Sequence, residues 1–168
     1  MKTLLTTATM AAALIAAPPP VAANIFADAS LLATIESVKV FVVDDVKGGC
    51  LFNAEKIKAR LSATLERSGI TVSEGSRWLF FVYLVGNAVR SGDSSSGCVA
   101  NFNFQLLHHE PNDAWILAAQ AGALSLGPDV RDSYAMQNAE QFADEMIASI
   151  LAARRSVSRS DVSGPRVT

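Results

Sequence analysis

The sequence predicts an α+β fold: a two-layer sandwich in which two helices cover one face of a four-stranded mixed sheet, in the order β-α-β-β-β-α. Two observations carry this prediction. Four segments have the β-branched runs or alternation of strands, and two have the apolar stripe of an amphipathic helix. A β-α-β crossover favours a parallel pair, and the last three strands follow one another as an antiparallel meander. The strands are expected at residues 38–43, 78–90, 98–108 and 115–126, and the helices at 54–68 and 133–154.

Residues 1–23 are typical of a cleavable secretory signal peptide. Lys2 gives a positive start, residues 4–17 are uncharged and mostly apolar, and three prolines at 18–20 end any helix. Small residues at 21–23 predict cleavage after Ala23. A membrane span needs about 20 apolar residues, so an uncleaved anchor is the less favoured alternative. No cysteine follows the run to carry a lipid. We therefore expect a periplasmic or secreted protein without a membrane span.

The rest of the chain divides into a lead-in segment, 24–37, with a short helix expected around residues 27–34, a single α/β domain, 38–154, and a disordered tail, 155–168. The first strand, 38–43, is β-branched and apolar. Asn53 is a typical cap for the helix that follows, and residues 57, 61 and 65 form its apolar stripe. Gly69 fits the left-handed position after a helix.

The remaining elements follow from alternation and turn residues. Residues 78–85 are apolar on both alternating faces, which is typical of a central strand covered on both sides. Residues 91–97 are Ser, Gly and Asp and predict a loop, and 98–108 alternate between apolar and polar residues. Pro111 favours a turn before the last strand. The second helix has an apolar stripe at residues 135, 139, 142, 146 and 150.

The two cysteines, Cys50 and Cys98, predict a disulfide because an even count in an exported protein favours a bridge. Two free buried thiols are the alternative. If the first two strands run parallel, the first strand ends at the edge where the third begins. The predicted fold therefore brings the two cysteines together.

The largest functional signal is apolar surface that two helices cannot cover. They cover one face of the sheet only, and the second strand is apolar on both faces. An exposed apolar patch usually marks an interface. We therefore predict that another envelope protein, or a homodimer partner, binds through the open sheet face, unless residues 24–37 fold over it. The candidate interface residues are Phe41, Leu79, Phe81, Tyr83 and Val85.

The charge distribution argues against nucleic acid as a partner. The formal net charge is −2, and four of the basic residues lie between positions 154 and 166, so the body of the domain is more acidic than the whole chain. Affinity for nucleic acid comes mainly from basic contacts to phosphate. Four arginines spread over the tail are a weak polybasic signal, and a solvated tail is the expected reading.

No motif predicts a catalytic residue, a metal site or a cofactor. Residues 40–45, which end in Asp44 and Asp45, resemble the first strand of a response-regulator receiver, but the later strands of that family are missing. Residues 91–97 resemble the nucleophile segment of chymotrypsin-like proteases, but that family needs a His upstream of the Ser, and both histidines lie downstream. His108 and His109 are adjacent on a strand, so their side chains point to opposite faces and cannot easily share a metal.

In element order alone, residues 38–153 resemble small α/β accessory domains of Gram-negative envelopes. Examples are the N-terminal domain of the Tol-system translocation protein and the lipopolysaccharide-assembly lipoprotein. The resemblance implies an adaptor role. We therefore expect a non-enzymatic envelope accessory protein that acts as a protein-interaction module.

Two alternatives remain open. The first is a binder of a small apolar or envelope-derived ligand, in a pocket lined by Phe102, Phe104 and Phe142. The second is a hydrolase, which requires an acid to converge with a histidine in a cleft. The candidate acids are Asp44, Asp45 and Asp93, and the candidate bases are His108 and His109.

Overall fold

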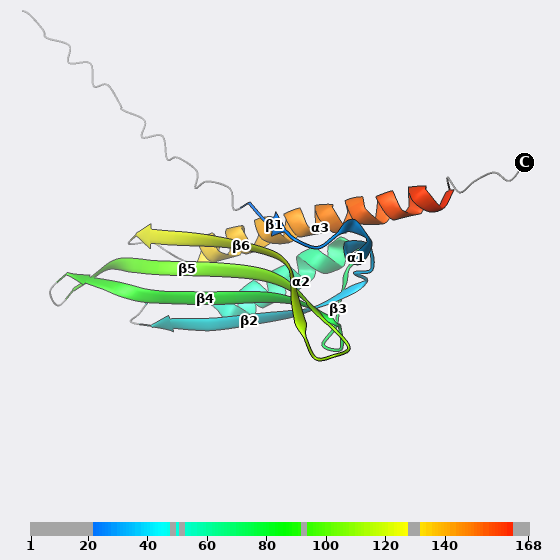
Figure 1. The fold of residues 1–168 in the computed structure, drawn as a ribbon. Coiled ribbons are helices and arrows are strands. Elements are labelled where there is room, and N and C mark those ends of the chain that lie inside the picture. The colour runs from blue at the N-terminus through cyan, green and yellow to red at the C-terminus, as the bar shows by residue number, and fades with distance from the viewer. Residues whose placement is uncertain (1–21, 48–49, 51–52, 92–93, 128–131, 163–168) are drawn as a thin grey trace, which may run out of the picture.

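In the computed structural model the described residues are 22–47, 50, 53–91, 94–127 and 132–162. They form one mixed sheet with three helices (Figure 1). The sheet has six strands in the order β1-β6-β5-β4-β2-β3. The elements are β1 (Asn24–Ile25), α1 (Ala29–Ala33), β2 (Ser37–Lys47), α2 (Ala54–Arg67), β3 (Thr71–Val72), β4 (Trp78–Ser91), β5 (Ser94–His109), β6 (Trp115–Gly127) and α3 (Asp132–Val162).

The prediction of four strands and two helices is therefore wrong, although the fold is still α+β. The four long strands and the two long helices overlap the predicted segments, but β2 continues to Lys47, and β5 begins at Ser94, within the expected loop at 91–97. The additional elements are short: β1 and β3 have two residues each, and α1 has five. The two-residue strands are too short to show a period of 2, so the sequence pattern does not reveal them. Helix α1 lies within the short helix expected around residues 27–34.

The strand directions agree with the predicted crossover and meander. β2 and β4 run parallel, with Lys39 paired to Leu79 and Lys47 to Asn87. β4, β5 and β6 are antiparallel neighbours. The crossover between β2 and β4 contains α2, and Figure 1 shows α2 and α3 together on one side of the sheet.

Helix α2 begins and ends as its residues predict. The Asn53 side chain accepts a hydrogen bond of 2.9 Å from the Lys56 N–H. At the other end Gly69 has a φ of 77°, which glycine adopts without the cost of a side chain. The Ile70 N–H reaches back to the Leu65 carbonyl, and both side chains are buried. These contacts fix the angle at which the chain leaves the helix.

The segment before β2 lies along the sheet edge and the helices, not over the open face. β1 pairs with β6, and α1 packs against α3. The carboxylate of Glu145 on α3 accepts a hydrogen bond of 2.7 Å from the Ala23 N–H. Leu32 and Ile35 belong to the core, and the Arg154 guanidinium donates to the Ile35 carbonyl. The alternative in which residues 24–37 cover the open face is therefore wrong.

The long C-terminal helix differs from the prediction at its end. Helix α3 continues through Val162, past the predicted end at residue 154, and its side chains at 155–159 are exposed. Extending a formed helix costs far less than starting one, so the helix continues without an apolar stripe. Residues 163–168 and the predicted signal segment 1–21 lie outside the described residues. No described helix is long and apolar enough to cross a membrane.

Cys50 and Cys98 are joined by a disulfide, with their Cα atoms 5.9 Å apart. Cys50 follows β2 and is buried. Cys98 lies on β5 and is paired with Ala88 of β4. The bridge therefore ties the connection between β2 and α2 to a strand two places away in the sheet.

Replacing both cysteines with alanine is expected to lower the free energy of unfolding by about 2–4 kcal/mol, because the bridge closes a long loop in the unfolded chain. Urea unfolding of the oxidised protein and of the double variant measures the difference. Adding a reductant to the wild-type protein should reproduce it. Equal midpoints for oxidised, reduced and substituted protein would contradict a structural bridge.

Candidate interaction face

The two faces of β4 have different environments. Trp78, Phe80, Val82 and Leu84 are all buried, with exposed fractions of 5% or less. They face the helices, since the Phe80 ring lies 5.2 Å from the ring of Phe142 on α3. Because strand side chains alternate, the other residues of β4 point away from the helices. These are Leu79, Phe81, Tyr83 and Val85, which are partly exposed.

Phe41 joins this row from the neighbouring strand. It is paired with Phe81, and their ring centroids lie 6.0 Å apart with planes inclined by 14°. The Tyr83 ring lies 6.3 Å from the Phe81 ring at an angle of 11°. Phe41 is 46% exposed. The structure thus brings together the five predicted interface residues on the side of the sheet away from the helices. We call this side the open face.

Polar amides continue the open face on β5. Asn101, Asn103 and Gln105 are paired with Val85, Tyr83 and Phe81. The Oδ1 atom of Asn103 is buried and has no hydrogen-bond partner among the described residues. A buried acceptor without a partner is costly, because it has lost its hydration without gaining a hydrogen bond. The open face therefore has an aromatic half on β2 and β4 and an amide half on β5.

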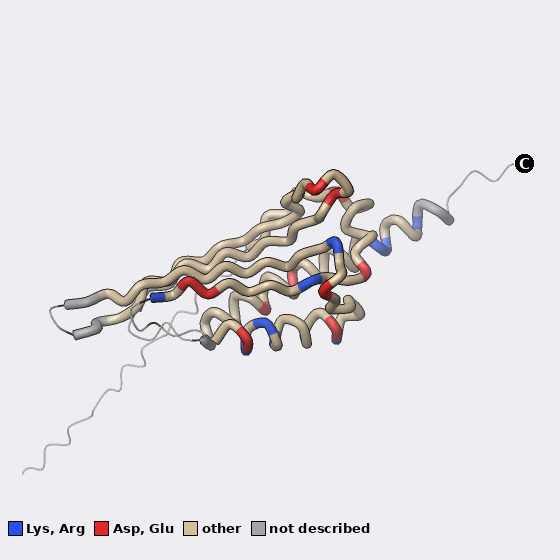
Figure 2. The backbone as a smooth tube through the Cα atoms, turned by 90° about the horizontal axis from the view of Figure 1, so that it is seen from below, with Lys and Arg blue, Asp and Glu red and all other residues tan. Residues whose placement is uncertain are grey.

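The charge of the open face is confined to the two ends of β2, where Lys39, Asp45 and Lys47 alternate with Phe41 and are paired with Leu79, Val85 and Asn87. Among the residues of β4, β5 and β6, Arg90 is the one Lys, Arg, Asp or Glu. Figure 2 shows the charged residues gathered on the helices, at the ends of β2 and in the turns. Leu124 of β6 lies opposite Asn101, on the same face, and is 62% exposed. The alternation of β6 is the signal that places it there, and the sequence reasoning did not use it.

The candidate catalytic residues do not converge. His108 is paired with Trp78 and Asp44 with Leu84, six residues further along β4, which separates them by about 20 Å. The His108 Nδ1 atom lies 3.0 Å from a carboxylate oxygen of Glu110. The ring of the second histidine, at position 109, lies 4.6 Å from the Trp115 ring, with the two planes inclined by 42°. Both histidines thus have local partners around the turn between β5 and β6. Asp93 lies outside the described residues.

The space between sheet and helices is filled. Phe102, Phe104 and Phe142 are each 0% exposed, and the Phe104 and Phe142 rings lie 5.7 Å apart. The predicted pocket for an apolar ligand is therefore occupied by the core. No group of three or more His, Cys, Asp or Glu within the described ranges could hold a metal ion.

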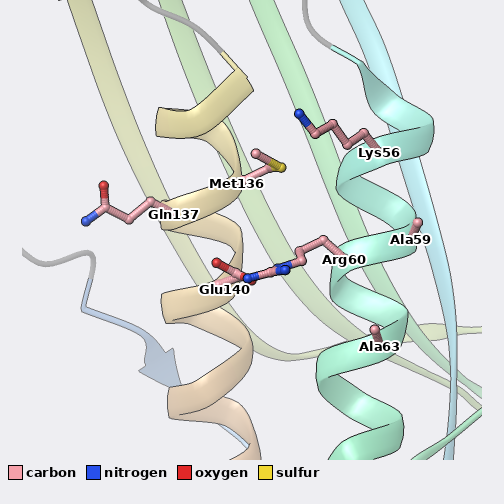
Figure 3. Close-up of a pocket in the computed structure, with 7 residues that line it drawn as sticks. All are labelled: Lys56, Ala59, Arg60, Ala63, Met136, Gln137 and Glu140. Carbon is pink, nitrogen blue, oxygen red and sulfur yellow. The ribbon is translucent and has the colours of Figure 1, made fainter.

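A hollow of about 560 Å³ lies instead between α2 and α3, on the helical side. In Figure 3 Lys56 and Met136 point into it from opposite helices, and Arg60 reaches across to Glu140. Arg60 and Glu140 form an ion pair that spans the gap. The hollow is open to solvent, and small side chains such as Ala59 and Ala63 form part of its lining. It therefore offers few groups that would fix a ligand.

Comparisons with known proteins leave the identity open. No protein-family model and no curated protein match the sequence. Three solved structures, each similar over most of this chain, have low identity to it.

A PelC dodecamer from Paraburkholderia phytofirmans is 14% identical, with 77% of this chain and 95% of that chain covered and a TM-score of 0.44. A PDZ domain protein from Parabacteroides distasonis is 11% identical, with 72% of this chain and 34% of that chain covered and a TM-score of 0.48. The rare lipoprotein B from Shewanella oneidensis is 9% identical, with 75% and 96% covered and a TM-score of 0.28.

All three TM-scores are below 0.5. At this level the likenesses carry no argument about family or function. The element-order resemblance to envelope accessory domains therefore stays a prediction.

Proposed function

We propose that the protein is an exported, non-enzymatic accessory protein of the cell envelope that binds another protein through its open face. The disulfide supports a location outside the cytoplasm, since such bridges persist in oxidising compartments. β1 begins at Asn24, so cleavage after Ala23 would leave every described strand and helix in the mature chain.

The observation that carries the proposal is the row of aromatic rings on a face that no described helix covers. Phe41, Phe81 and Tyr83 lie side by side there, on a rigid sheet rather than on a loop. Aromatic residues are enriched at protein interfaces, and fully buried interface centres are depleted of charge. The centre of the open face, around Phe81 and Tyr83, has both properties, since the charged residues of β2 lie at its ends.

The composition of the open face also defines the chemistry of the partner. A charged group pressed against the rings of Phe41, Phe81 and Tyr83 would lose its hydration without gaining a counter-ion there, which is costly. The amides of Asn101, Asn103 and Gln105 both donate and accept hydrogen bonds. The partner surface should therefore be apolar where it meets the rings, and uncharged but polar where it meets the amides.

A photo-activated cross-linking residue placed at Tyr83 tests the proposal in intact cells. We expect a discrete adduct with one partner protein. The matched control is the same cross-linker at Glu66, which is exposed on α2, on the other side of the sheet. No adduct at Tyr83, or the same adducts at both positions, would contradict a role for the open face.

A further inference from the structure

Both edges of the six-stranded sheet are only partly covered. β1 pairs with β6 at Ala119 and Gln120, and β3 pairs with β2 at Ser37 and Val38. Beyond these contacts, no described strand pairs with the outer side of residues 121–127 or 39–47. An uncovered edge presents a row of backbone N–H and C=O groups that can pair with another strand.

The two uncovered edges differ in how they are protected. The stretch 39–47 of β2 contains Lys39, Asp44, Asp45 and Lys47. Charged residues on an edge discourage pairing with another chain. The whole of β6 has no charged residue and no proline, and its described register shift lies near Leu117, before the uncovered stretch. Within the described residues, the uncovered stretch of β6 therefore has no charge, proline or register shift that would discourage pairing.

The direction of the backbone groups on β6 follows from its contact with the segment at residues 26 and 27. The Ala118 carbonyl accepts hydrogen bonds of 2.8 and 3.1 Å from these two N–H groups, so it points outward. Backbone groups of an antiparallel strand alternate in direction. The outward groups of the uncovered stretch therefore belong to Gly122, Leu124 and Leu126.

We propose that this edge pairs with the same edge of a second copy of the chain, antiparallel and about a twofold axis at Leu124. The pairing joins two six-stranded sheets into one continuous sheet. It uses the backbone edge of β6, with the Leu124 side chain at the border of the open face, and it does not depend on the function proposed above.

Three features favour a second copy over another extended chain. The uncovered stretch is centred on Leu124, so an antiparallel copy matches its whole length and places Gly122 opposite the partner's Leu126. A twofold interface requires such self-complementarity. The stretch is uncharged, so two copies meet without repulsion between like charges.

The third feature is the exposed side chain of Leu124, which would meet its own copy at the axis. It is 62% exposed in the single chain, and burial against an identical leucine removes apolar surface from water. A perpendicular twofold axis also keeps both open faces on the same side of the joined sheet.

Sedimentation equilibrium of the protein, secreted from its full-length precursor, tests the proposal. We expect a dimer, and we expect Leu124→Pro to raise its dissociation constant by at least about tenfold, because each copy loses an outward N–H. Proline is tolerated on an edge where the N–H faces solvent, so the bonds to β5 remain. Circular dichroism checks that the variant is folded.

A second variant keeps the test valid if proline disrupts the strand. With Leu124→Cys, oxidation should link two copies, since directly opposed residues of a hydrogen-bonded pair have Cα atoms about 5.5 Å apart. The matched control is Ile116→Cys, which is exposed on the same strand outside the paired stretch. It should give no symmetric cross-link.

Three results would overturn the proposal. One is a monomer at every concentration measured. Another is a dimer that survives Leu124→Pro and is lost on Phe81→Asp, which would place the dimer contact on the open face. The last is a monomer whose Leu124→Cys variant is cross-linked in cells to a different protein, which would assign the edge to another chain.

Discussion

Replacing Phe142 with alanine is expected to lower the free energy of unfolding by about 3–5 kcal/mol. Its ring is fully buried and lies 5.2 Å from the Phe80 ring and 5.7 Å from the Phe104 ring. The Phe142 ring thus packs α3 against the helix-facing sides of β4 and β5. The loss has two parts, the transfer of apolar surface and the cavity that remains. Small domains have a total stability of about 5–15 kcal/mol, so the variant should be close to unfolding.

Urea unfolding followed by tryptophan fluorescence measures this change, since Trp78 is buried near one end of the same core. The matched control is Met136→Ala on the same helix, whose side chain is only partly buried at the wall of the hollow. Met136→Ala should lower the free energy of unfolding clearly less than Phe142→Ala does. If both variants have the same unfolding midpoint, the core is not centred on Phe142.

Replacing Phe81 with aspartate is expected to abolish partner binding while leaving the fold intact. The side chain lies between the rings of Phe41 and Tyr83, at the centre of the aromatic half of the open face. Aspartate removes the central ring and places an unpaired charge where the partner would exclude water. Central aromatic residues of an interface typically account for 2 kcal/mol or more, a loss of affinity of roughly 30-fold or greater.

The cost to the isolated fold should be small. Phe81 is not part of the buried core, and substitutions on a half-exposed strand position span about 1 kcal/mol. The matched control is Glu66→Lys, an exposed change of charge on α2. It should change neither the stability nor the partner.

The sequence predicts the open face well because alternation is a strong signal. Residues 78–85 are apolar on both faces, which shows that two apolar rows exist. Alternation alone does not show which row the helices cover. The structure resolves this through the contact of Phe80 with Phe142, which leaves Phe81 on the other side. The row that the sequence predicts as the interface does lie on the face away from the helices. Its role as an interface stays a prediction.

The sequence does not predict the edges of the sheet. β1 and β3 form where the chain runs beside the edge strands β6 and β2. Strands of two residues are too short to show an alternating pattern in the sequence. The uncovered part of β6 starts after Gln120, because β1 begins at Asn24, which pairs with Gln120. The importance of Leu124 follows from that endpoint and from the direction of the Ala118 carbonyl, and both are tertiary facts.

The yield of the cross-linked complex at Tyr83, measured with and without Phe81→Asp, tests the central claim most directly. Thermal unfolding of both proteins is measured in parallel. We expect a fall in yield of at least about tenfold with little change in the unfolding midpoint. An unchanged yield in the folded Phe81→Asp variant would contradict the claim that the open face is where the partner binds.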